Sequence, residues 1–179
     1  LHGPPFARRR RDRFAAVAAE LLRRQADVLL LQEVWFPKDW EMLTAALAAE
    51  YLPITDPLRT GYLRESGLCA YVLRRSEWGA HPTTPTRFTR FIDAAPWWRF
   101  WEGDGISRKG ILQVSLQHQT TQQTLMAFNT HFQAEYGLPR YAHIRHSQFQ
   151  DLAEHAAQVP ADIPLIAAGD LKTDPQEPV

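Results

Sequence analysis

Residues 28–35 read VLLLQEVW, an unbroken run of four apolar side chains followed at once by a glutamine and a glutamate. A short apolar run of this kind predicts a β-strand that is covered on both faces. We expect a helix on either side of it. Residues 8–25 repeat apolar side chains at helical spacing, and residues 37–51 begin with Pro37, which favours the first turn of a helix. Helix, strand and helix in this order predict a layered α/β domain.

The second half of the chain predicts a hairpin, a third helix and two more short strands. Residues 79–96 contain three prolines and four threonines, so we expect a loop or lid there, because proline cannot donate to a β-ladder. The expected elements are a strand at 68–73, alternating hairpin strands around 112–116 and 125–131 with a turn at 117–123, a helix at 139–157 and a buried strand at 164–169.

The composition is that of one globular domain, so we treat residues 1–179 as a single unit. Twenty basic residues balance twenty acidic ones, which removes an overall field that would attract nucleic acid or an acidic membrane. The first helix is rich in arginine and is either a solvated face or a phosphate-tracking patch. Cys69 is the only cysteine, which excludes an internal disulfide. No apolar run reaches the roughly 18 residues that a membrane span needs, and we expect a monomer.

Polar side chains stand where three of the expected strands end. Glu33 follows the first strand and offers the hard oxygen ligand that Mg²⁺ prefers. Asn129 and His131 are two residues apart on one strand, so they share a face and could meet one phosphate. Asp170 follows the last strand and could orient a water or a second ion. Each residue also has a structural alternative, as a helix cap for the carboxylates or a packed histidine for His131.

Five motifs, taken in order, resemble the endonuclease/exonuclease/phosphatase superfamily over nearly the whole chain, and two of them are most similar to the neutral sphingomyelinases. The motifs are LQEVW (31–35), GDGISRKG (103–110), NTHFQAEY (129–136), an Arg145-x-x-Gln148 helix and GDLK (169–172). The resemblance implies a four-layer α/β/β/α sandwich. It also implies phosphodiester hydrolysis by an in-line water with Mg²⁺, for which Mn²⁺ or Co²⁺ could substitute. Sphingomyelin would yield ceramide and phosphocholine, with the phospholipid met at a membrane surface.

The same resemblance assigns roles to individual residues. Glu33 would hold the metal, His131 would stabilise the phosphoryl oxygens, Asp170 would help to position the nucleophile, and Lys109 would be a supporting cation. This pattern fits the residue chemistry, because a phosphodiester needs positioning and charge neutralisation rather than a covalent nucleophile.

The chain departs from the superfamily pattern in one residue and at both ends. Lys172 stands where the Gly-Asp-x-Asn motif has asparagine, although a lysine there could bind phosphate as a point charge. The superfamily's first strand, with a metal-site asparagine, would precede Leu1. Its closing strands, with the Ser-Asp-His element that supplies a general base, would follow Val179. We therefore expect a partial domain that is catalytically silent by itself.

Two other functions stay open at this point. A nuclease of the same superfamily would share every motif, and a degenerate, non-catalytic binding module would explain Lys172. The aromatic cluster at 96–101 is either core and lid packing or an anchor at a bilayer surface.

Overall fold

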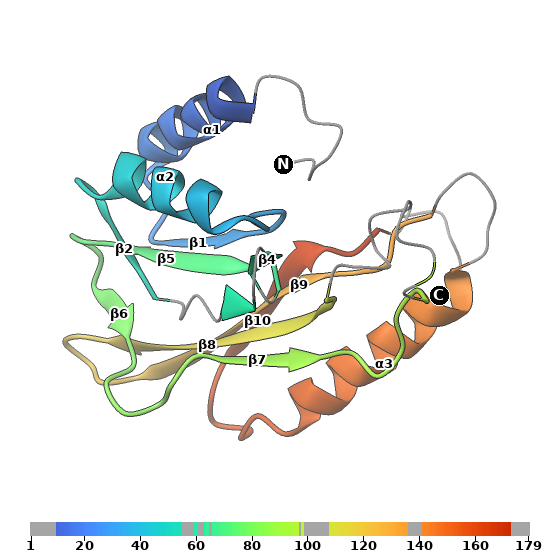
Figure 1. The fold of residues 1–179 in the computed structure, drawn as a ribbon. Helices are drawn as coiled ribbons and strands as arrows, with labels where there is room; N and C mark the ends of the chain where they lie inside the picture. Colours follow the sequence, from blue (N-terminus) through green and yellow to red (C-terminus); the bar gives the residue numbers. More distant parts are fainter. Residues whose placement is uncertain are drawn as a thin grey trace.

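The computed structural model describes residues 10–54, 59–60, 63–64, 66–96, 98, 108–135 and 141–172. Figure 1 shows two β-sheets stacked face to face, with α1 and α2 on the outer face of one sheet and α3 on the outer face of the other. The expected four-layer α/β/β/α arrangement is confirmed. Most of the GDGISRKG motif and of the aromatic cluster, together with Pro139, lies outside the described residues.

The first sheet has the strand order β1-β5-β2 and lies under α1 (Arg10–Arg24) and α2 (Pro37–Leu47). Its strands are β1 (Val28–Leu31), β5 (Cys69–Leu73) and β2 (Tyr51–Pro53), and β5 pairs antiparallel with both neighbours. The prediction that the second helix reaches residue 51 is wrong. Tyr51 is fully buried, and its hydroxyl donates to the carbonyl of Ala26 at 3.1 Å, so tertiary packing draws this residue into β2.

The second sheet has the order β10-β9-β8-β6, with β7 also paired to β8. The predicted hairpin is confirmed, and its register sets Val114 opposite Ala127. The parallel pairing of β10 with β9 sets Asp170 directly beside His131. The strands are β6 (Trp78–Ala80), β7 (Arg87–Arg90), β8 (Gly110–His118), β9 (Thr124–His131) and β10 (Leu165–Asp170), and a separate two-stranded pair joins β3 (Arg59–Thr60) to β4 (Leu63–Arg64).

Apolar side chains fill the space between the layers. The cluster between the sheets joins β5 to β8 and β9, and it consists of Leu68, Ala70, Leu112, Val114, Leu116 and Ala127. A second cluster packs the two N-terminal helices on the first sheet, and a third packs α3 (Ala142–Ala157) on the second. Burial on both faces explains why the strands read as continuous or alternating apolar runs.

Two local expectations need correction. Residues 79–96 are not all loop, because they contain the end of β6 and the whole of β7; the prolines lie outside these strands. A lid role for this range stays a prediction. The strand at 164–169 forms, but it is not buried, since Ile166 is 52% exposed and β10 pairs only with β9 among the described strands. Among the described residues, no helix is long and apolar enough to cross a membrane.

Candidate active site

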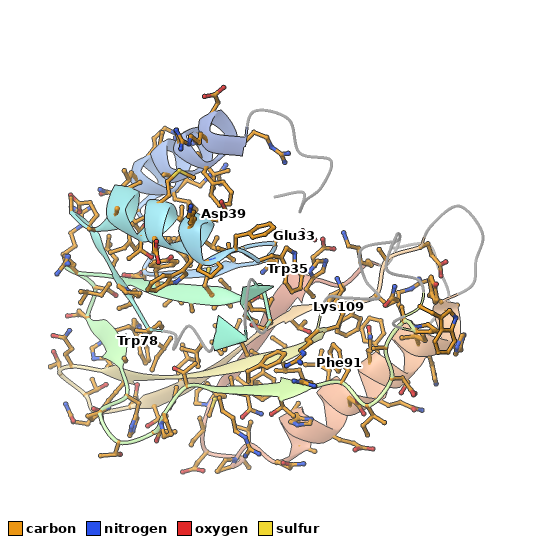
Figure 2. The ribbon with its side chains drawn as sticks, in the orientation of Figure 1. Glu33, Trp35, Asp39, Trp78, Phe91 and Lys109 are labelled. Carbon is orange, nitrogen blue, oxygen red and sulfur yellow. The ribbon has the colours of Figure 1, made fainter. Side chains whose placement is uncertain are left out.

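The ends of β1, β9 and β10, together with the start of β8, bring the candidate residues to one end of the two sheets. Figure 2 shows Glu33, Trp35 and Lys109 grouped there, with Trp78 at the opposite end. Two glycines allow the strands to approach closely. A Cβ on Gly169 would lie 2.0 Å from the backbone oxygen of Thr130, and one on Gly110 would lie 2.2 Å from that of Thr89. Gly169 therefore lets β10 bring Asp170 close to β9, and Gly110, next to Lys109, lets the start of β8 approach β7.

His131 is the centre of the site. Its side chain is 2% exposed, and three charged groups lie near its Nε2 atom. Lys109 Nζ is at 3.1 Å, Glu33 Oε1 at 3.4 Å and Asp170 Oδ2 at 3.8 Å. An ammonium can only donate a hydrogen bond, so Nε2 accepts in the contact with Lys109. The structure thus brings together four of the six predicted site residues around one imidazole.

The imidazole of His131 is neutral. Burial, as the largest cause, and the positive charges of Lys109 and Lys172 together lower its pKa to about 3, while Asp170 acts in the opposite direction. Its Nδ1 atom is buried and has no hydrogen-bond partner among the described residues. His131 is therefore a polar, uncharged group at the base of a charged site, with one nitrogen that the fold leaves unsatisfied.

Glu33 is held in place by Trp35. The residue has a left-handed backbone conformation (φ +67°), which is uncommon for a glutamate and turns the chain sharply after β1. The indole Nε1 of Trp35 donates to Glu33 Oε2 at 3.0 Å, which leaves Oε1 on the side of His131. The Trp35 ring also lies 6.0 Å from Lys109 Nζ, a cation–π distance. Trp35 therefore orients both the carboxylate and the buried ammonium.

Asp170 is paired with Lys172. The ammonium lies 2.7 Å from Oδ2, and the Lys172 backbone N–H donates to Oδ1 at 3.3 Å. Burial alone would raise the pKa of Asp170, but the hydrogen bonds and charge of Lys172, with a contribution from His131, outweigh it and the pKa is lowered. Asp170 is thus an ionised carboxylate with a fixed countercharge.

Asn129 lies behind this group and not in it. Its Nδ2 donates to the carbonyls of Leu31 and Cys69 at 2.9 and 3.1 Å, and its Oδ1 accepts from Gln32 at 2.7 Å. Both amide hydrogens are used, so this arrangement leaves neither for the phosphate contact that the sequence suggested. Asn129 instead joins the end of β1 to β9 across the two sheets.

Sequence reasoning missed Gln32 and Trp35 as functional residues, although both stand in the LQEVW motif. It also missed a buried polar network between α3 and the segment that follows β9. Gln148 Oε1 accepts from the backbone N–H of Gln133 at 2.9 Å, and its Nε2 donates to the carbonyl of Asp93 at 3.1 Å. Arg145 pairs with Glu135 at 2.5 Å. The Arg-x-x-Gln spacing on one helix was the signal for this network.

The side chains near His131 limit the kind of metal site that this chain could form. Among the described residues, no three His, Cys, Asp or Glu side chains are grouped so that they could hold an ion together. The carboxylate of Glu33 is 20% exposed and, within the described part of the chain, accepts a hydrogen bond from the neutral indole of Trp35 on one oxygen, whereas Asp170 already pairs with an ammonium. These residues fit a Mg²⁺ ion that is held by one carboxylate and completed by waters and substrate oxygens.

The comparison with protein families identifies the class. The chain matches the Endonuclease/Exonuclease/phosphatase family over residues 1–178, and it belongs to that family. Within the family, the chain is 29% identical to sphingomyelin phosphodiesterase 2 of Homo sapiens, over 97% of this chain and 39% of that protein. It is 27% identical to inositol phosphosphingolipids phospholipase C of Schizosaccharomyces pombe, over 93% of this chain and 38% of that protein. The chain thus spans about two fifths of these relatives.

Solved structures agree on the fold. Sphingomyelinase C from Streptomyces griseocarneus superposes with a TM-score of 0.69 at 23% identity, covering 94% of this chain and 59% of that one. The human Nocturnin catalytic domain superposes with a TM-score of 0.67 at 20% identity, covering 94% and 58%. These similarities confirm the sandwich that the sequence motifs implied.

Proposed function

We propose that the protein containing this chain is a divalent-metal-dependent phosphodiesterase that hydrolyses a sphingolipid phosphodiester, with sphingomyelin as the first substrate to test. The observation that carries the proposal is the convergence of Glu33, Lys109 and Asp170 on the neutral, buried His131. Such a group combines hard carboxylate oxygens with a buried cation, which is what charge neutralisation on a phosphoryl group requires.

Each residue has a defined part in the proposed reaction. Glu33 holds the Mg²⁺ ion, which when bound supplies Lewis-acid stabilisation of the phosphoryl oxygens. Lys109 and His131 form the buried floor. When a phosphate enters, the ammonium turns its other N–H groups towards the phosphoryl oxygens, while the unprotonated Nε2 of His131 accepts from the remaining one and holds the ammonium in place. Asp170, on the exposed rim, orients the attacking water, with Lys172 fixing the carboxylate.

The sphingolipid assignment is supported by the two relatives described above, whose names refer to sphingomyelin and to inositol phosphosphingolipids. Two exposed apolar side chains favour a substrate that is met at a membrane surface. Ile92 is 82% exposed and Trp98 is 56% exposed, and tryptophan prefers the boundary between water and lipid.

The direct test is phosphocholine release from sphingomyelin in mixed micelles by the purified full-length protein, with and without Mg²⁺. The proposal predicts release that EDTA abolishes. Plasmid nicking under the same conditions tests the nuclease alternative, and Mg²⁺-dependent nicking without lipid turnover would replace the proposal with it. Binding of sphingomyelin vesicles without either reaction would favour the non-catalytic module.

A further inference from the structure

The use of lysine in this chain is unusual. The sequence contains seventeen arginines and only three lysines, Lys38, Lys109 and Lys172. Two of these three contact the group around His131, one on the buried floor and one on the rim. Arginine is a planar fork suited to bidentate pairing, whereas lysine is a compact point charge with three rotatable donors. If the three lysines were placed at random in this arginine-rich chain, two of them would rarely fall in one site.

The two ammonium groups are joined through the site. Lys109 Nζ lies 3.1 Å from His131 Nε2, this nitrogen lies 3.8 Å from Asp170 Oδ2, and Lys172 Nζ lies 2.7 Å from the same oxygen. The side chain of Lys172 is 30% exposed, and Asp170 accounts for only one of its three donors among the described contacts. A small anion at the rim can therefore reach Lys172 while that lysine still holds Asp170.

The charges of the site are balanced by the chain itself. Two carboxylates, Glu33 and Asp170, and the ammonium of Lys109 lie around His131 Nε2, and the ammonium of Lys172 pairs with Asp170. A neutral asparagine at position 172 would leave one uncompensated negative charge, which a divalent cation would have to offset before an anionic phosphate could enter. With Lys172 present, the electrostatic barrier to an anion is already removed.

The backbone at position 172 adds a second argument. Lys172 has a left-handed conformation (φ +53°), which asparagine adopts far more readily than lysine. The chain therefore carries a lysine at a position whose geometry favours asparagine. A lysine in this conformation is locally unfavourable, which points to its charge as the useful property.

We propose that Lys109 and Lys172 form a phosphate-binding site that works without a divalent ion. The proposal rests on the proposed function for its site but not on turnover. The ligand chemistry is a phosphate group, supplied either by a phosphocholine head group or by free phosphate. The two lysines would then place the phosphate before a divalent ion is bound at Glu33.

The test is a titration of the purified protein with inorganic phosphate in EDTA, followed by NMR of protein labelled with ¹⁵N-lysine. Signals are assigned with the Lys109→Met and Lys172→Asn variants. We expect the Lys109 and Lys172 signals to shift together with one dissociation constant, and Lys38 on α2 to stay still as an internal control. Lys172→Asn should weaken phosphate binding about tenfold, the value of one charge-assisted hydrogen bond. Lys172→Arg keeps the charge but not the compact ammonium, so it should bind phosphate more tightly than Lys172→Asn and less tightly than the wild type.

A wild-type protein that shows no saturable shift in EDTA, or a Lys172→Asn variant that binds phosphate as tightly as the wild type, would overturn the proposal. Neither result bears on sphingomyelin turnover with Mg²⁺, so the proposed function would stand or fall separately. A parallel titration with phosphocholine identifies the source of the ligand. Equal affinities assign the site to any phosphate group, whereas tighter binding of phosphocholine assigns it to the lipid head group; both results retain the two-lysine site.

Discussion

The two carboxylates that lie near His131 Nε2 are stabilised in different ways. Glu33, at the end of β1, accepts from the neutral indole of Trp35, whereas Asp170, at the end of β10, accepts from the ammonium of Lys172. A neutral donor orients a carboxylate and leaves its charge for a cation, while an ammonium cancels that charge. Under the proposed function, this difference favours Glu33 as the residue that would hold the metal and Asp170 as the one that would position water.

The largest effect is expected at Glu33. Glu33→Gln keeps the size and the contact with Trp35 but removes the charge that would hold the ion, so Mg²⁺-dependent turnover should fall by about three orders of magnitude or more. The measurement is phosphocholine release at saturating Mg²⁺. Glu154→Gln, an exposed change on α3, is the matched control and should have wild-type activity. Undiminished turnover by Glu33→Gln would remove the metal from this side of the site.

The next effect concerns the neutral imidazole between the two sides. The pKa of His131 is about 3 in the folded protein, below its usual value near 6.5, so the neutral form stabilises the fold fully above pH 6.5 and this stability is lost as the pH falls towards 3. Between pH 7 and pH 4 in EDTA, the wild type should lose about 3 kcal/mol more unfolding free energy than His131→Gln.

Denaturant titrations at several pH values measure this difference in unfolding free energy. Stability curves for the wild type and His131→Gln that run parallel with pH would show that the imidazole titrates normally. The claim that His131 is neutral in the folded protein would then be wrong.

A smaller effect is expected from the neutral donor on the Glu33 side. Trp35→Phe preserves an aromatic ring but removes the N–H that bonds Glu33 Oε2. Hydrogen-bond partners of metal ligands contribute about 10-fold to 100-fold to metal affinity, so the Mg²⁺ concentration for half-maximal activity should rise by about tenfold with little change in maximal rate. A lower maximal rate at unchanged Mg²⁺ dependence would mean that Trp35 acts through Lys109 instead.

The smallest effect separates charge from backbone strain at position 172. Lys172→Gln and Lys172→Asn both remove the charge, but only asparagine suits the left-handed conformation. The asparagine variant should be more stable than the glutamine variant by about 0.5–1 kcal/mol, measured by chemical denaturation. Equal stabilities of the two variants would show that position 172 is unstrained.

The sequence predicted the layers of the fold well and the ends of its elements less well. Apolar periodicity identified α1, β1, β5, the hairpin and α3, because each buries a regular face. It extended α2 into β2, since the burial of Tyr51 beneath the helices is a tertiary effect that periodicity does not contain. It missed β7, where nearby prolines suggested a loop although none of them lies within the strand.

The sequence predicted those site residues that have a chemically suitable side chain and also lie at the end of an expected strand. Glu33, His131 and Asp170 each follow or end a strand, and the structure groups them. The sequence did not predict that the Asn129 amide bonds to the first sheet, because its partners Leu31 and Cys69 are 98 and 60 residues away in the sequence. The left-handed conformation of Glu33, which directs its carboxylate, also has no signature in the residue type.

Mn²⁺ titration calorimetry on the wild type, Glu33→Gln and Asp170→Asn tests most directly whether the metal belongs to the Glu33 side. The account predicts that Glu33→Gln abolishes the binding heat, whereas Asp170→Asn retains Mn²⁺ affinity within about tenfold, because the charge it removes is already paired with Lys172. Binding that survives Glu33→Gln but is lost in Asp170→Asn would contradict it.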